Sequence, residues 1–260
     1  MPTFLFDSIV FGPVRSRRLG VSLGINLLPV SRKVCSFNCI YCECGWTSGV
    51  SGGSSALPSR SAVSEALRIK LSEMKEQGKA PDVITYAGNG EPTLHPDFAA
   101  IIDDSVALRN EYFPKARISV LSNGSTLRRK SVREALKKVD MNVLKLDSVI
   151  PSTVKRLNQP RNTVGLAKFE QYVKDFDGRF IIQTLFVRGE CNGATVDNTT
   201  PEETDAWLEA IARLRPQSVM IYTIDRDTPA GSNLKKVPVA ELETIAGRVQ
   251  ALGIITSVSG

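Results

Sequence analysis

The sequence predicts an α/β protein whose parallel sheet closes only part of a barrel, a partial (β/α)6 barrel with a short extra C-terminal strand. Three observations lead to this fold class. Short apolar runs alternate with amphipathic runs of helical spacing. The apolar runs end in polar or glycine-containing loops, which is typical of strand-to-helix connections. The alternation occurs six times, whereas a complete barrel needs eight units over ~250 residues. A doubly wound sheet is the alternative.

The expected strands are short, apolar and rich in β-branched residues, as strands buried on both faces usually are. Pro29 ends the first of them, and the others stop at polar or glycine loop residues. In chain order they span residues 21–28, 83–87, 117–121, 141–146, 179–187 and 218–222, with the extra strand at 254–258.

The expected helices carry apolar residues at spacings of three and four, which place those residues on one face. Gly78 and Gly253 stop two of the helices, and Thr200 with Pro201 starts another as N-cap and first-turn residue. In chain order they span residues 61–77, 97–111, 126–138, 164–176, 201–214 and 239–252.

Composition indicates a folded chain that stays away from membranes. Hydrophobic residues make up 42% of the 260 residues and charged residues 23%, which is ordinary for a globular protein. The apolar runs are far shorter than the ~20 residues of a membrane-spanning helix. The N-terminus lacks the basic head of a secretion signal. We therefore expect a cytoplasmic protein with one domain over residues 1–260, and a flexible Gly/Ser loop over about 48–59.

The net charge of +6 is unevenly distributed. Two basic blocks, residues 1–60 and 109–145, lie on either side of the acidic segment 61–108. Such blocks are usually solvated helix faces, but they also suit an anionic partner such as RNA or a phosphorylated small molecule.

Four of the five cysteines fall within ten positions, in a loop over about 30–46. Cys35, Cys39 and Cys42 form a CxxxCxxC motif, and three thiolates at this spacing can converge on one metal centre. A second cysteine pair, as structural zinc would need, does not follow. Three thiolates suit a four-iron cluster that leaves one iron open for chemistry. Cys44 is a fourth ligand or a small buried residue, and Cys191 a free structural thiol.

The CxxxCxxC motif with an aromatic residue, Tyr41, before its third cysteine resembles the radical S-adenosylmethionine (SAM) superfamily, over about residues 12–225. The resemblance implies a partial TIM-like barrel and a [4Fe–4S] cluster held by Cys35, Cys39 and Cys42. It also implies that SAM chelates the fourth iron, with Tyr41 against the adenine. The expected activity is reductive cleavage of SAM to a 5′-deoxyadenosyl radical, which abstracts hydrogen from an unidentified substrate. An electron donor such as flavodoxin or ferredoxin is then a partner.

The loops after the expected strands add candidate cofactor contacts, because chemistry collects at the carboxyl ends of parallel strands. The run Gly88-Asn89-Gly90-Glu91 is similar to the family's glycine-glycine-glutamate motif, which binds the SAM amino group; Asn89 replaces a glycine of that motif. Asn123 stands where the family often has an asparagine near the SAM carboxylate and ribose. An ordinary turn explains each loop equally well when it is taken alone.

Polar residues on the later strands extend this list. Lys145 and Asp147 alternate with leucines, so they share one face of their strand. Asp147 is a candidate for the ribose hydroxyls and Lys145 for a substrate anion. Gln183 needs a buried partner, and Tyr222 contacts adenine or packs in the core. His95, just ahead of a helix, is expected to have a capping or packing role.

Several substrates stay open. Arg15, Arg17 and Arg18, together with the run over 23–29, resemble the subfamily that contains the tRNA wybutosine-synthesising radical SAM enzymes, which implies a tRNA or nucleoside. A small metabolite or a peptide is the general alternative, and a glycyl-radical enzyme activase would act on a partner protein. A non-enzymatic zinc or redox module built on the clustered cysteines is the alternative from another class.

Overall fold

The computed structural model describes residues 4–16, 19–47, 57–162, 164–226, 228–229 and 232–260. Its main sheet has eight strands in the order β1-β2-β3-β4-β5-β6-β9-β11. All neighbours from β2 to β11 are parallel, and β1 pairs antiparallel with β2. The strands are β1 (Val10–Ser16), β2 (Gly20–Ile25), β3 (Val83–Tyr86), β4 (Arg117–Ser122), β5 (Met141–Lys145), β6 (Ile181–Leu185), β9 (Ser218–Tyr222) and β11 (Ile255–Ser259).

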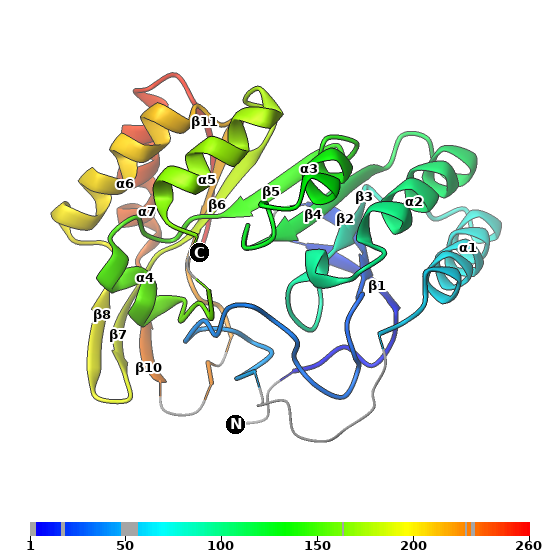
Figure 1. Cartoon of the computed structure of the whole chain (residues 1–260), viewed down its shortest axis with the longest axis horizontal. Coiled ribbons are helices and arrows are strands. Elements are labelled where there is room, and N and C mark those ends of the chain that lie inside the picture. Colours follow the sequence, from blue (N-terminus) through cyan, green and yellow to red (C-terminus); the bar gives the residue numbers. More distant parts are fainter. Residues whose placement is uncertain (1–3, 17–18, 48–56, 163, 227, 230–231) are drawn as a thin grey trace.

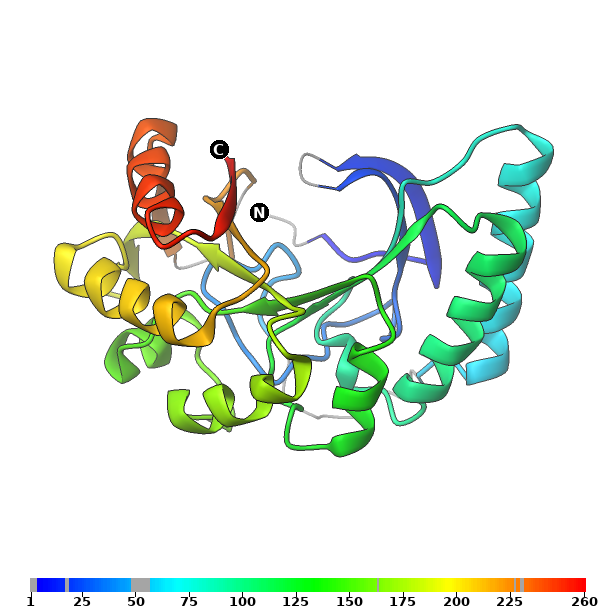
Figure 2. The ribbon, with the colours of Figure 1, turned by 90° about the horizontal axis from the view of Figure 1, so that it is seen from above.

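The sheet curls into an open arc with helices on its convex side, which confirms the partial barrel (Figure 2). The expected C-terminal strand is β11, which pairs with β9 at the end of the arc. The helices are α1 (Arg60–Glu76), α2 (Phe98–Tyr112), α3 (Lys130–Leu136), α4 (Pro151–Leu157), α5 (Leu166–Val173), α6 (Pro201–Leu214) and α7 (Val239–Gln250), with short 3₁₀ turns at Pro92–Leu94 and Lys174–Phe176.

Both faces of the central strands are buried, which explains their nearly continuous apolar runs. Leu144 and Ile182 belong to the main hydrophobic core between the sheet and the helices. Trp207 of α6 packs in the same core. Met141 and Val143 belong to a smaller cluster with Ile181 and Met220. Strand alternation puts Lys145 on the same face as Met141 and Val143, above this apolar layer. The inner face thus has an apolar floor and a polar layer at the carboxyl ends of the strands.

Some elements differ from the expectation. The run 179–187, expected as one strand, divides into β6, which pairs with β9, and β7 (Val187–Cys191), which pairs with other strands. β7 joins β8 (Ala194–Asp197) and β10 (Ser232–Lys236) in a separate antiparallel sheet, order β10-β7-β8, on the side of the cysteine loop (Figure 1). β1 and α4 were not expected either.

Two sequence features fall outside the described residues: most of the Gly/Ser loop, at 48–56, and the arginines at 17 and 18. Among the helices that the structure describes, none is long and apolar enough to cross a membrane.

Candidate active site

A cavity of about 340 Å³ opens at the carboxyl ends of the parallel strands. The cysteine loop after β2, the loops after β3 and β4, and the ends of β5, β6 and β9 all contribute to its wall. The predicted site residues on this wall are Cys35, Cys39, Tyr41, Cys42, Gly88, Gly90, Glu91, Asn123 and Tyr222. Cys35 and Tyr222, which are 187 positions apart in the sequence, therefore line one cavity, as the partial barrel predicts.

The cysteine loop is fixed on both sides by backbone hydrogen bonds. On one side Val34 forms a parallel bridge with Gly90, and its carbonyl accepts from Glu91 N–H at 3.1 Å. On the other side Ile40 N–H donates to the carbonyl of Leu157, the last residue of α4, at 3.0 Å. The loop that carries the sulfurs is thus held between the loop after β3 and α4.

Lys33 places a buried cation beside the sulfurs. Its side chain is 4% exposed, and Nζ donates to the carbonyl of Gly45 at 2.8 Å. Burial lowers the pKa of Lys33, but the nearby Cys42, Cys35 and Cys39 outweigh it and raise the pKa above its ordinary value. A buried ammonium is costly without anionic partners, so this environment favours thiolates around it.

The cysteines differ in acidity. Burial raises the pKa of Cys35 to about 12 and also raises the pKa of Cys39. A hydrogen bond from Cys44 lowers the pKa of Cys42 to about 5, and Lys33 adds to this effect; the pKa of Cys44 rises in turn. Buried thiols of raised pKa become thiolates only with a compensating cation, which a metal centre supplies.

The donor set fits an iron–sulfur cluster better than a lone ion. Three soft sulfurs from one loop line a cavity that also holds a buried cation, and clusters of this kind carry negative charge on their thiolates. Within the described residues, no three His, Cys, Asp or Glu side chains lie close enough to hold a single metal ion.

Glu91 links the loops after β3 and β4 through a buried carboxylate, 2% exposed. It accepts hydrogen bonds from Thr93 N–H at 3.1 Å, Ser122 Oγ at 2.9 Å and Asn123 N–H at 2.6 Å. Burial raises the pKa of Glu91, and these donors act against that effect. The carboxylate therefore positions both loops and also faces the cavity.

Gly90 permits the close approach of this loop to the cysteine loop. Its φ is +140°, and a Cβ would lie 1.9 Å from the carbonyl oxygen of Val34.

We expect Gly90→Ala to lower the free energy of unfolding of the apoprotein by about 2–4 kcal/mol, since the backbone of the two loops would have to move apart. Urea denaturation measures the loss. The matched control is Gly253→Ala, which also has positive φ (+77°) but meets nothing within 4 Å, and should cost about 1 kcal/mol. Equal losses for the two variants would contradict this role of Gly90.

Asn89, the residue that replaces a family glycine, directs its side chain away from the cavity. Nδ2 donates to the carbonyls of Phe6 and Pro29 at 2.9 Å each, and Oδ1 accepts from Phe6 N–H at 2.8 Å. Asn89 is fully buried and is not among the residues lining the cavity. The asparagine thus ties the N-terminal segment to the loop after β3.

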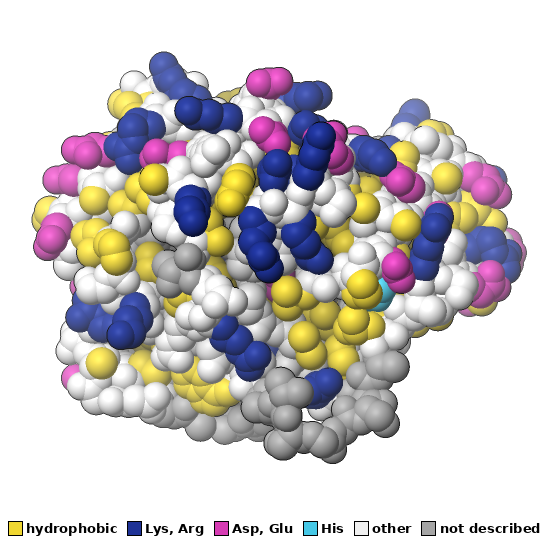
Figure 3. All heavy atoms as spheres, viewed as in Figure 1, with side chains coloured by type: hydrophobic (Ala, Val, Ile, Leu, Met, Phe, Trp, Pro, Cys, Tyr) yellow, Lys and Arg dark blue, Asp and Glu magenta, His cyan; other side chains and the backbone are white. Residues whose placement is uncertain are grey.

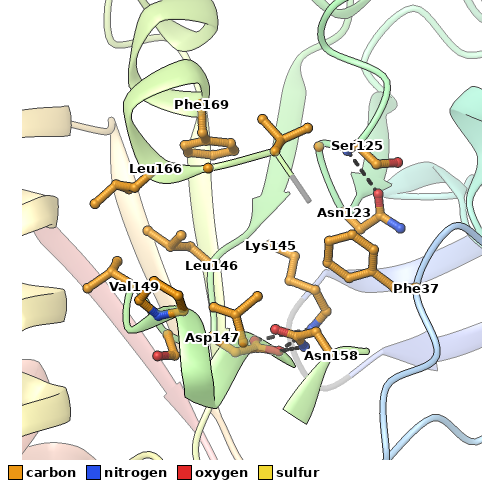
Figure 4. Close-up of a pocket in the computed structure, with 16 residues that line it drawn as sticks. Phe37, Asn123, Ser125, Lys145, Leu146, Asp147, Val149, Asn158, Leu166 and Phe169 are labelled. Carbon is orange, nitrogen blue, oxygen red and sulfur yellow. Dashed lines mark hydrogen bonds and ion pairs between the residues drawn. The ribbon is translucent and has the colours of Figure 1, made fainter. Parts of the chain in front are cut away.

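Asp147 is surrounded by protein donors. Its carboxylate accepts from the phenol of Tyr41, from Lys145 Nζ at 2.9 Å, from Asn158 Nδ2 at 2.7 Å and from Leu185 N–H at 3.0 Å. Figure 4 shows Lys145 and Asn158 converging on it. Asp147 lines a smaller cavity of about 90 Å³ instead of the main one. This buried network joins the end of β5 to the cysteine loop.

Burial alone would lower the pKa of Lys145, but the facing Asp147 raises it above its ordinary value, so the amine stays charged. Lys145 Nζ also lies 4.7 Å from the ring centroid of Tyr41. Burial, with Asp147 beside it, raises the pKa of the Tyr41 phenol and keeps it neutral. Tyr41 and Lys145 therefore form one unit with Asp147 at the cavity wall.

The other predicted residues occupy different places. Gln183 is 9% exposed and lines the main cavity. Arg226 lines the same cavity and forms an ion pair with Glu43 of the cysteine loop at 2.9 Å. His95 has the expected capping role, since its ring contacts the Pro58 carbonyl and accepts from the N–H of the N-cap of α2. Cys191 is buried in β7 and does not line the cavity.

Sequence reasoning missed Lys33, Phe37 and Asn158. Lys33 lies in the Arg-Lys dipeptide before the first cysteine, where a cation is usually solvated. Asn158 ends α4 and resembles an ordinary helix cap. The adjacency of Lys33 to the motif was the one available signal.

Comparison with known proteins identifies the family. A sequence profile described as the radical SAM superfamily matches residues 31–174, more than half of the chain. The chain belongs to the radical SAM superfamily. Membership in this family of enzymes agrees with the fold and with the cysteine motif, which lies within the matched residues.

Two individual relatives share 30% and 29% sequence identity with this chain. A protein of Brachyspira hyodysenteriae named GTPase Obg is 30% identical over 223 residues, which are 84% of this chain and 30% of that protein. A UPF0026 protein of Helicobacter pylori strain J99 is 29% identical over 224 residues, covering 84% of this chain and 67% of that protein. The chain thus spans less than a third of the first relative and about two thirds of the second.

Solved structures share the fold at low identity. A radical SAM methyltransferase from Sphaerobacter thermophilus aligns with a TM-score of 0.67 at 13% identity, covering 92% of this chain and 65% of that one. Archaeal TYW1 aligns with a TM-score of 0.54 at 12% identity, covering 88% of this chain and 71% of that one. At these identities the likeness establishes the fold and no more, so the wybutosine subfamily stays a prediction.

Proposed function

We propose that this chain is a radical SAM enzyme with one [4Fe–4S] cluster bound by Cys35, Cys39 and Cys42. The observation that carries the proposal is the convergence of these three sulfurs and the Glu91 loop on one cavity at the carboxyl ends of the strands. The proposed SAM contacts are Tyr41, Gly88, Asn89, Gly90, Glu91, Asn123, Asp147 and Tyr222. Among these, Asn89 and Asp147 would act by holding their neighbours, since their polar atoms bond to protein groups.

Bound together, the cluster and SAM supply the reductive cleavage that yields a 5′-deoxyadenosyl radical for hydrogen abstraction. The chain's own residues prepare the site. Lys33 offsets the charge of the thiolates, and Glu91 presents a carboxylate to an amino group. Gly88 and Gly90 bring backbone close to the ligand, and the barrel wall shields it from water.

The proposed function is tested by anaerobic reconstitution of the full chain with iron and sulfide, followed by an assay for 5′-deoxyadenosine. We expect formation of 5′-deoxyadenosine to require SAM and a low-potential reductant, with flavodoxin or ferredoxin as the donor class in a cytoplasmic setting. Reconstituted protein that binds iron yet leaves SAM intact would overturn the assignment.

The substrate class is a separate proposal. A tRNA substrate is favoured by the exposed Arg15 and Arg128. In the basic block 109–145, however, Arg109, Arg133, Lys137 and Lys138 form ion pairs with acidic neighbours. Figure 3 shows the Lys and Arg side chains spread over the face rather than gathered in a band. A tRNA complex whose affinity falls steeply with salt would support a tRNA substrate, whereas absent binding favours a small metabolite or peptide.

A further inference from the structure

Two asparagine side chains direct amide N–H groups at two of the three ligand sulfurs. Nδ2 of Asn123, after β4, lies 3.5 Å from Cys35 Sγ. Nδ2 of Asn158, at the end of α4, lies 3.5 Å from Cys39 Sγ. Lys33 and the third sulfur residue, Cys42, line the same cavity. Cys35 and Cys39 therefore each face an amide nitrogen from a side chain outside the cysteine motif.

The orientation of Asn158 is fixed by its surroundings. An amide has two N–H bonds, and Asn158 Nδ2 also donates to Oδ2 of Asp147 at 2.7 Å. A carboxylate accepts and cannot donate, so the nitrogen of the amide must face it. The backbone carbonyl of Asn158 accepts from Asn38 N–H, within the cysteine loop, at 2.9 Å, which anchors the residue as a whole beside that loop. Asn158 is 3% exposed, and its amide therefore stays between Asp147 and the Cys39 sulfur.

Asn123 is held in a comparable way. Its Nδ2 donates to Ser36 Oγ at 3.0 Å, and its Oδ1 accepts from Ser125 N–H at 3.0 Å. Phe37 N–H adds a backbone donor to Cys35 at 3.4 Å. The sulfur of Cys35 thus has two N–H neighbours.

We propose that Asn158 and Asn123 set the reduction potential of the cluster through these N–H···S contacts, with Asp147 as the positioning residue of Asn158. The proposal rests on the proposed function, because it needs the cluster at these cysteines. Reduction takes the cluster from the 2+ to the 1+ state with one electron from a flavodoxin- or ferredoxin-class donor. The added negative charge spreads onto the sulfurs, where N–H dipoles stabilise it. The contacts therefore raise the potential and make the reduced state easier to reach.

The experiment is a redox titration of the reconstituted full chain, followed by electron paramagnetic resonance (EPR) without SAM. At the wild-type midpoint potential, Asn158→Leu should lower the ratio of reduced to oxidised cluster about tenfold, which corresponds to ~59 mV for one electron. Leucine keeps the shape of asparagine and removes both N–H groups. Asn123→Ala tests the same idea at Cys35, on a half-buried residue that tolerates truncation better, and should shift the potential in the same direction.

The matched control is Asn198→Leu. Asn198 is a buried amide that donates to the carbonyls of Asp147 and Leu185 but contacts no sulfur, so its variant should keep the wild-type potential. Unchanged potentials in Asn158→Leu and Asn123→Ala, at full iron content, would overturn the inference and leave the proposed function intact. A wild-type chain that assembles no cluster would overturn the proposed function itself.

Discussion

Cys39→Ser is expected to abolish cluster assembly and to reduce 5′-deoxyadenosine formation at least ~10³-fold. Cys39 is the middle sulfur of the motif, 7% exposed, and the adjacent Ile40 is hydrogen-bonded to α4. A serine oxygen is a hard, weakly acidic ligand and cannot replace a thiolate that iron prefers. Iron analysis and the SAM-cleavage assay, both under anaerobic conditions, measure the two effects.

Two cysteine variants serve as controls. Cys191→Ser changes a buried thiol of β7 away from the cavity and should keep iron and activity. Cys44→Ser removes the hydrogen bond to Cys42 and should keep the iron, because Cys44 lies outside the proposed ligand set. Loss of iron from Cys44→Ser together with full iron in Cys39→Ser would refute the ligand assignment.

Glu91→Gln is expected to weaken SAM binding to the cluster-loaded protein by about tenfold to hundredfold, the scale of one lost charge-assisted hydrogen bond. The substitution also places an amide where the carboxylate accepts from the donors Thr93, Ser122 and Asn123. Two donors would then face each other, at a cost of about 1–3 kcal/mol in the free energy of unfolding. Equilibrium dialysis with SAM and urea denaturation measure the two quantities.

Glu203→Gln separates the two effects. Glu203 is a buried carboxylate of α6 that accepts from Ser148 Oγ at 2.7 Å and lies outside the cavity wall. Its variant should lose stability and keep wild-type affinity for SAM. Equal loss of SAM affinity in both variants would mean that Glu91 acts through fold stability instead of direct contact.

The barrel was predictable because its strands are buried on both faces. A run such as Val83–Tyr86 is buried throughout and mostly apolar, so its place in a parallel sheet is visible in the sequence. β1 and β10 were missed for the opposite reason. β1 contains Pro13 and lies at the edge of the main sheet, and β10 is mostly polar and exposed, so neither has a strand-like pattern.

The ligand set was predictable from spacing, but the residues that tune it were not. Cys35, Cys39 and Cys42 lie within eight positions, whereas the contact between Asn158 and Cys39 joins residues 119 positions apart. Only the packing of α4 against the cysteine loop creates that contact. The role of Asn89 could not be predicted from the sequence either, because its hydrogen-bond partners Phe6 and Pro29 come from distant segments.

The metal content of the anaerobically reconstituted full chain tests the central claim most directly. We expect about four iron and four sulfide per chain, with an EPR signal on reduction that changes when SAM is added to the open iron. One zinc per chain and no iron would contradict the enzyme assignment and would favour a non-enzymatic cysteine module.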